Sequence, residues 1–170
     1  MSFSTLVAEI LLVPASNALA PKRNEDETLL ARLNTLTLDT LFAPHKIKSR
    51  SDAECVHSAL FLWHDYLDES HKISQEIETQ NGSYWHGIMH RREPDYGNAK
   101  YWFRKVGAHP IFPALGSDWD PFAFIDQCEL AAKKKDAKLD EQCRAIQKTE
   151  FDLLLEHCWR AALGVKSLNC

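Results

Sequence analysis

The sequence predicts an all-α fold, a single-domain bundle of four to six helices. Apolar residues recur at three- and four-residue steps along most of the 170-residue chain, and no convincing alternating strand pattern competes. Glycine and proline are few and lie mostly between the periodic segments. Because each amphipathic helix must bury its apolar face against another, a bundle follows. The length suits one domain, which we expect to cover residues 1–170.

The first apolar stretch, Leu6 to Ala20, is predicted to be a short amphipathic segment rather than a secretory signal. Glu9 interrupts it and no basic residue precedes it. We expect residues 1–24 to be packed on the domain or loosely attached to it. No window reaches the ~20 apolar residues that a membrane span needs, so we expect a cytoplasmic protein with no membrane partner.

A helix is predicted within Glu25–Phe42, because Leu29, Leu33 and Leu36 have helical spacing and Pro44 follows. The alternation Thr35–Leu38 leaves a short extended end open.

The next helix is predicted to begin at a capping box formed by Ser51 and Glu54. Its core stripe is Val56, Leu60, Trp63 and Leu67, and it should run to about Thr79. Asn81-Gly82 should end it, since glycine tolerates the left-handed geometry that closes many helices.

Four further helices follow from their start and stop residues. They are predicted at Ser83–Arg92 (ended by Pro94), Asn98–Val106 (ended by Gly107), Asp120-Pro121 to about Lys133, and Asp136–Leu163 (followed by Gly164). Residues 109–117 should form a loop, and Lys133–Lys135 a solvated junction.

Composition excludes several classes of function. The net charge of −4 gives no overall attraction to nucleic acid. The five cysteines are scattered and form no C-x-x-C pair, which argues against a disulfide framework and a zinc ribbon and favours buried free thiols. No nucleophile elbow and no glycine-rich phosphate loop occur.

Polar and aromatic residues gather in one third of the chain. Six of the eight histidines lie between His57 and His109. The sharpest element is Trp85–Glu93, where His86 and His90 are one helical turn apart and Glu93 continues their face. Two imidazoles and a carboxylate can hold a divalent ion such as Zn²⁺ or Fe²⁺. The alternatives are a hydrogen-bonded pair beside Trp85 or a polar surface face.

A second stripe precedes it on the helix predicted from Ser51. Its members are His64, Asp68, His71 and Gln75, with His57 near the same face. If this stripe meets His86 and His90, His71 becomes a third ligand or a general base. The alternative is an ordinary solvated face.

Cations flank the histidines. Arg92 and Arg104 are candidates to orient a small anionic substrate, as is Lys100, and Asp95 is a candidate hydrogen-bond partner of the site. The alternative is internal pairing of these cations with Glu93 and Asp95.

The stretch Ser83–Asp95, together with Asn98–Arg104, Gly107-x-His109-Pro110 and Asp68-x-x-His71-x-x-x-Gln75, resembles a widespread group of small uncharacterised helical proteins. The resemblance covers about a third of the chain and implies no activity. It favours treating the segment as one unit.

Three hypotheses of function follow. The first is a metal-assisted hydrolase or lyase acting on a small anionic substrate, with metal ligands His86, His90 and Glu93 (or His71) and supporting residues Arg92, Arg104 and Asp95. The second is a non-catalytic module that binds a small ligand or peptide in a hydrogen-bonded pocket. The third is a purely structural cluster that joins short helices.

Overall fold

The structure, a computed structural model, describes residues 2–165, and all regular elements in that range are helical. The helices are α1 (Thr5–Leu12), α2 (Glu27–Asn34), α3 (Leu38–Phe42), α4 (Arg50–Trp63), α5 (Leu67–Ser74), α6 (Gln80–Arg92), α7 (Tyr96–Val106), α8 (Phe112–Leu115), α9 (Pro121–Lys134) and α10 (Ala137–Ala162). The all-α prediction is confirmed. The prediction of four to six helices is wrong, since residues 2–165 contain ten.

Two predicted helices are each divided in the structure. Residues 25–42 separate into α2 and α3 because Thr37 and Thr40 form a capping box that starts a new helix. No strand forms over Thr35–Leu38: Thr35 is helical, and Thr37 is extended as the N-cap of α3.

The helix predicted from Ser51 to Thr79 is divided as well. It begins earlier, at Arg50, with Ser49 rather than Ser51 as the N-cap. It then breaks at His64–Tyr66, where Asp65 has a φ of +64°. A residue in this left-handed region cannot continue a right-handed helix, so α5 sets off in a new direction.

Helix α6 begins at Gln80, so Asn81-Gly82 starts it instead of ending the previous helix. Gly82 is needed for close approach: a Cβ there would lie 2.3 Å from the carbonyl oxygen of Ile77. Gly87, also on α6, has the same role toward α7, where a Cβ would lie 2.8 Å from the Phe103 ring. These glycines let α6 pack tightly on its neighbours.

Helices α7, α9 and α10 match their predictions to within two residues. Their N-caps are Asp95, Asp120 and Asp136, each accepting a backbone N–H in the first turn. Gly107 and Gly164 follow α7 and α10 with positive φ. The loop predicted at 109–117 contains the four-residue α8.

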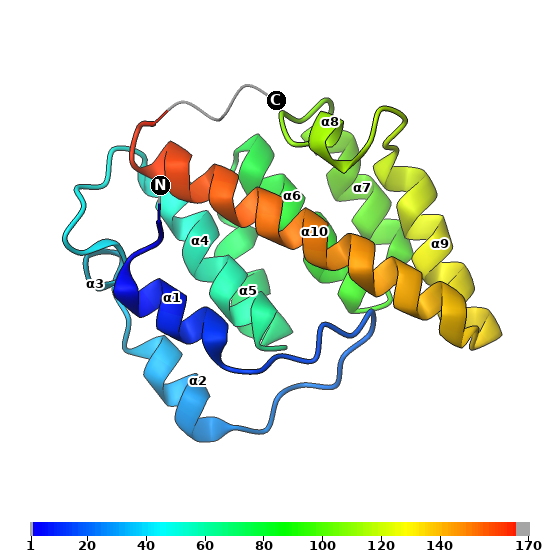
Figure 1. Cartoon of the computed structure of the whole chain (residues 1–170), viewed down its shortest axis with the longest axis horizontal. Coiled ribbons are helices and arrows are strands. Elements are labelled where there is room, and N and C mark those ends of the chain that lie inside the picture. The colour runs from blue at the N-terminus through cyan, green and yellow to red at the C-terminus, as the bar shows by residue number, and fades with distance from the viewer. Residues whose placement is uncertain (1, 166–170) are drawn as a thin grey trace.

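Helix α6 lies at the centre, and every residue from Gly82 to Arg92 is buried. The long α10 runs across the molecule, pairs with α9 at one end and packs on α4 (Figure 1). Helices α5 and α7 pack on α6. The core is apolar and includes Leu60, Trp85 and Trp159.

The amino-terminal residues contact the core. Val7 and Ile10 of α1 are fully buried. The stretch after α1 is fixed by hydrogen bonds from Ser16 Oγ to Asp65 Oδ2 (2.6 Å) and from Asn24 Nδ2 to the His64 carbonyl (3.1 Å). No helix within residues 2–165 combines the length and apolar character needed to cross a membrane.

Candidate metal centre

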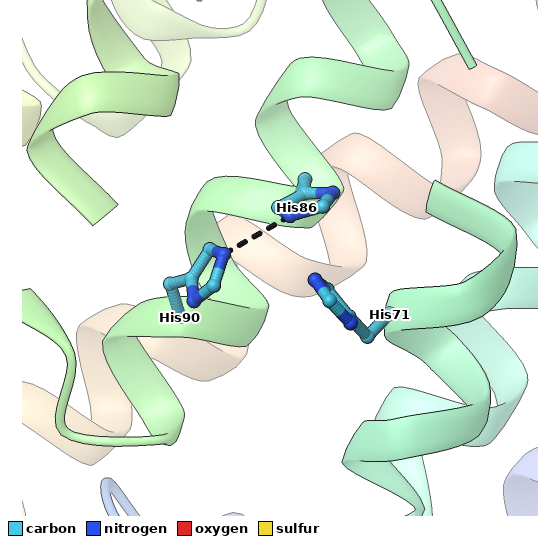
Figure 2. Close-up of side chains that lie close together, drawn as sticks. All are labelled: His71, His86 and His90. Carbon is cyan, nitrogen blue, oxygen red and sulfur yellow. Dashed lines mark hydrogen bonds between the residues drawn. The ribbon is translucent and has the colours of Figure 1, made fainter. Parts of the chain in front are cut away.

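Three histidines from two successive helices converge. His71 lies on α5, and His86 and His90 lie one turn apart on α6. One ring nitrogen from each lies within 4.8 Å of the others. Figure 2 shows the His71 ring directed from α5 toward the space beside His86 and His90. We call these three residues the histidine triad.

A hydrogen-bond chain fixes two of the rings. His86 Nε2 lies 3.0 Å from His90 Nε2 (Figure 2). On its other side, His90 Nδ1 lies 3.2 Å from Glu93 Oε2. His86 Nδ1 lies 3.3 Å from Ser74 Oγ. Each α6 imidazole is therefore held at Nδ1 and presents Nε2 to the other.

The partners assign the protons. An ionised carboxylate only accepts, so His90 Nδ1 carries hydrogen and Nε2 keeps its lone pair. His86 Nε2 therefore donates to His90 Nε2 at 3.0 Å, and His86 Nδ1 is left as an acceptor toward Ser74 Oγ. A metal ion bound to both Nε2 atoms would replace the hydrogen bond between them, with the His86 hydrogen moving to Nδ1.

Burial keeps the α6 imidazoles neutral. Desolvation, reinforced by the neighbouring His90 and His71, lowers the pKa of His86 to about 3. Desolvation also lowers the pKa of His90, although Glu93 opposes the shift. At neutral pH both imidazoles are therefore uncharged, which is the form that binds a metal ion.

Helix α7 covers the triad with an aromatic ring and a cation. Trp102 stacks on His86 with ring centroids 4.0 Å apart. Lys105 Nζ lies 4.1 Å from the centroid of the Trp102 ring. Lys105 is three residues beyond Trp102, so both are on the α7 face that meets the triad.

Glu93 and Asp95 have defined partners around the triad. Glu93 bonds His90, and His71 rather than Glu93 completes the group of converging ligand atoms. Asp95 is the N-cap of α7 and accepts from the backbone N–H and side chain of Asn98. These hydrogen bonds lower the pKa of Asp95.

The two arginines predicted to orient a substrate lie elsewhere. Arg92 is buried and donates to the carbonyls of Ala18 and Leu62 and to Asp65. Arg104 is exposed on α7, two residues from Trp102, and lies near the Tyr101 ring. Lys100 pairs with Asp126 of α9. Lys105 is the cation beside the triad.

The prediction of one stripe along a continuous helix is wrong, because the break at His64–Tyr66 separates His64 from Asp68, His71 and Gln75. His64 faces α1, where its Nε2 lies 3.1 Å from the Ile10 carbonyl oxygen. Asp68 and Gln75 are exposed. Of that stripe, His71 alone joins the triad.

A hollow of about 220 Å³ lies beside Glu93, the carboxylate that contacts His90. Its lining residues are Pro21, Arg23, Asp65, Leu67, Asp68, Arg92, Glu93 and Pro94. Glu93 thus borders this hollow and also contacts His90. The volume is below the ~300–1,000 Å³ of sites for drug-sized ligands, so it suits a small molecule.

Sequence reasoning missed a buried charged network on the opposite side of α6. Arg91 Nη2 donates to Glu150 Oε2 at 2.5 Å, and Tyr84 Oη donates to Glu150 Oε1 at 3.0 Å. Arg91 also lies over the Phe124 ring. A signal was present: Glu150 occurs at core spacing in α10, seven residues after Cys143 and four before Leu154.

Comparison of the chain with models of protein families, with curated proteins and with solved structures finds no match. The resemblance of four segments to a group of small helical proteins stays a prediction; these are Ser83–Asp95, Asn98–Arg104, Gly107-x-His109-Pro110 and Asp68-x-x-His71-x-x-x-Gln75. The geometry of the site is therefore the evidence for function.

Proposed function

We propose that this protein is a metal-dependent enzyme, a hydrolase or lyase that acts on a small anionic molecule. The ion, Zn²⁺ or Fe²⁺, would be bound by His71, His86 and His90. The observation that carries the proposal is the convergence of three ring nitrogens within 4.8 Å. Three imidazoles are a known ligand set of catalytic zinc, so zinc is favoured.

The geometry fits an ion after small movements. Zinc binds imidazole nitrogen at about 2.0–2.1 Å, so two ligand nitrogens of a tetrahedral site are about 3.3 Å apart. The His86 and His90 nitrogens, at 3.0 Å, need to separate only slightly. His71 must approach, which rotation of its partly exposed side chain on α5 allows.

The surrounding groups have the roles expected around a catalytic ion. Glu93 and the Ser74 hydroxyl contact the Nδ1 atoms of two ligands, and hydrogen-bond partners of this kind orient metal-bound histidines. Three protein ligands leave a fourth position for water, whose pKa a bound ion lowers to about 7. Such a water attacks an electrophilic centre or accepts a proton near neutral pH.

The proposal that the substrate is anionic rests on two cations of α7. Lys105, beside Trp102, is the cation placed to attract an anionic group toward the triad. Arg104 adds exposed positive charge on the same helix. Arg92 is already occupied by three acceptors, so the proposal gives it no contact with substrate.

Metal content tests the proposal. The protein would be produced without a histidine tag and its metal measured by mass spectrometry, followed by calorimetric titration of Zn²⁺ into the metal-free chain. We expect His71→Ala, His86→Ala and His90→Ala each to remove one ion per chain, and Glu93→Gln to weaken binding about 10–100-fold. His45→Ala, at an exposed histidine outside the triad, is the matched control.

Activity is tested with small anionic esters such as para-nitrophenyl phosphate and with small carboxylate substrates for lyase chemistry. The proposal expects turnover that requires metal and disappears in His86→Ala. Metal content equal to the wild type in all three alanine variants would overturn the metal site. Ligand-induced thermal stabilisation without turnover would favour the non-catalytic binding module.

A further inference from the structure

A second group of potential metal ligands lies outside the histidine triad. Asp52 and Cys55 are three residues apart on α4, and Cys158 faces them from α10. One ligand atom from each lies within 4.8 Å of the others. Both thiols are fully buried, whereas Asp52 is partly exposed. We call these residues the thiol cluster.

The two sulfurs of the cluster are close together, and one of them has a hydrogen-bond donor. The Cys55 and Cys158 Sγ atoms lie within 4.8 Å of each other. Trp85 Nε1 donates to Cys158 Sγ at 3.4 Å. An N–H donor directed at sulfur stabilises a thiolate more than a thiol, because the thiolate is the stronger acceptor.

The carboxylate is held in the same way. Asp52 accepts from Ser49 Oγ at 2.6 Å and from Asn81 Nδ2 at 2.6 Å, one donor on each oxygen. A carboxylate has about four lone-pair positions, so each oxygen can still bind an ion. Asn81 is in turn fixed by His109, whose Nε2 lies 2.8 Å from Asn81 Oδ1. Asp52 is thus presented to the sulfurs in one orientation.

We propose that Asp52, Cys55 and Cys158 bind a thiophilic divalent ion of the zinc class, with water as the fourth ligand. Two thiolates and a carboxylate suit Zn²⁺, which is four-coordinate and borderline soft. Binding displaces both thiol protons to solvent, and two sulfur–metal bonds replace the two S–H bonds. The ion connects α4 to α10, so it stabilises the packing of these two helices.

A second pair of cysteines serves as an internal comparison for the thiol cluster. Cys128 of α9 and Cys143 of α10 form a second buried pair of thiols, close enough for each to influence the pKa of the other. Within residues 2–165 no carboxylate or imidazole joins that pair at ligand distance. The Arg91 guanidinium lies close enough to influence the pKa of both thiols. A positive neighbour and a missing third ligand make this pair a poor metal site, which provides a matched control.

Cobalt distinguishes the thiol cluster from the triad. The full chain would be refolded with Co²⁺ and a phosphine reductant, and its near-ultraviolet spectrum recorded. Thiolate-to-cobalt charge transfer reports sulfur ligands, which the triad lacks. We expect the band in the wild type, in His86→Ala and in Cys128→Ser, and its loss in Cys55→Ser and Cys158→Ser. Failure of metal binding at the triad can therefore be distinguished from failure of metal binding at the thiol cluster.

Asp52→Asn tests the site even if a serine variant does not fold. The Asp52 side chain is partly exposed, so its replacement disturbs the core less than replacement of a buried cysteine. We expect it to weaken cobalt binding about 10–100-fold without removing the band. We also expect Zn²⁺ to protect the two cluster thiols of the wild type from a thiol reagent and leave Cys128 and Cys143 unprotected. Absence of the band in the wild type would overturn the proposal, and so would a band with unaltered affinity in Asp52→Asn.

Discussion

The central helix α6 has two polar faces that differ in the charges of the side chains that meet there. Toward α10, Tyr84 and Arg91 meet Glu150, where a buried cation faces a buried anion. Toward α5, His86 and His90 meet His71, where three groups of one kind face each other. Both faces are buried, yet only the first is matched in charge.

The difference separates a structural network from a candidate binding site. Opposite charges satisfy each other when the protein folds, and removing one leaves the other unpaired in the core. The His86 and His90 imidazoles are neutral and share a hydrogen bond, which a cation bound to the ring nitrogens can replace. The Arg91–Glu150 face therefore contributes to stability, and the triad face is available to a ligand.

The largest effect is expected at the matched face. Glu150→Gln keeps the shape of the side chain but leaves the buried Arg91 charge uncompensated, which should lower the free energy of unfolding by about 3–5 kcal/mol. Denaturant titration measures it. The control is Glu156→Gln on the same helix, whose partly exposed side chain is 3.9 Å from Arg160 and should matter by less than about 0.5 kcal/mol. A loss below about 1 kcal/mol for Glu150→Gln would remove the contrast between the faces.

The next effect concerns Arg92, which fixes the chain near Ala18 and the break at Asp65. Arg92→Lys cannot reproduce the three-acceptor geometry, so we expect a loss of about 1.5–3 kcal/mol with unchanged metal content. Arg104→Lys on the surface is the control and should be near neutral. Lost metal affinity with wild-type stability would instead place Arg92 in the site.

A smaller effect is expected at Asp95. Loss of this N-cap in Asp95→Ala should cost about 0.5–2 kcal/mol, while Asp95→Asn, which can still cap α7, should cost less. Thermal unfolding of both variants measures the difference. Equal losses in the two variants would show that the carboxylate charge, and not the cap, is what matters there.

The smallest effect is a change in pH dependence. Because the folded-state pKa of His86 is lowered to about 3 from 6.5, the unfolded chain binds the proton first as pH falls. The stability from neutral His86 is present above pH 6.5 and is lost as pH falls through the window to about 3. We expect the free energy of unfolding of His86→Gln to fall less steeply with decreasing pH over that window than that of the wild type. The difference in slope should correspond to less than one bound proton, and denaturant titration at successive pH values measures it. An identical slope in the wild type and variant would contradict a desolvated His86.

Local signals allowed much of the fold to be predicted. Asp120 and Asp136 are N-caps that act on neighbouring residues in the sequence, so the starts of α9 and α10 could be predicted to within one residue. The break between α4 and α5 could not be predicted, since both flanks have helical spacing. Tertiary contacts hold it: Arg92 and Ser16 both bind Asp65, whose φ is positive.

The site was predictable to the same extent. The pairing of His86 with His90 follows from spacing within one helix. The approach of His71 depends on the turn between α5 and α6, where Gly82 packs against Ile77. Cys55 and Cys158 are about a hundred residues apart, so only the fold brings them together.

A crystal structure of the chain soaked in Zn²⁺, with anomalous scattering recorded at the zinc edge, tests the central claim most directly. The account predicts an anomalous peak about 2.0–2.1 Å from a ring nitrogen of each of His71, His86 and His90. Unaltered ring positions with no peak between them at saturating zinc would contradict it.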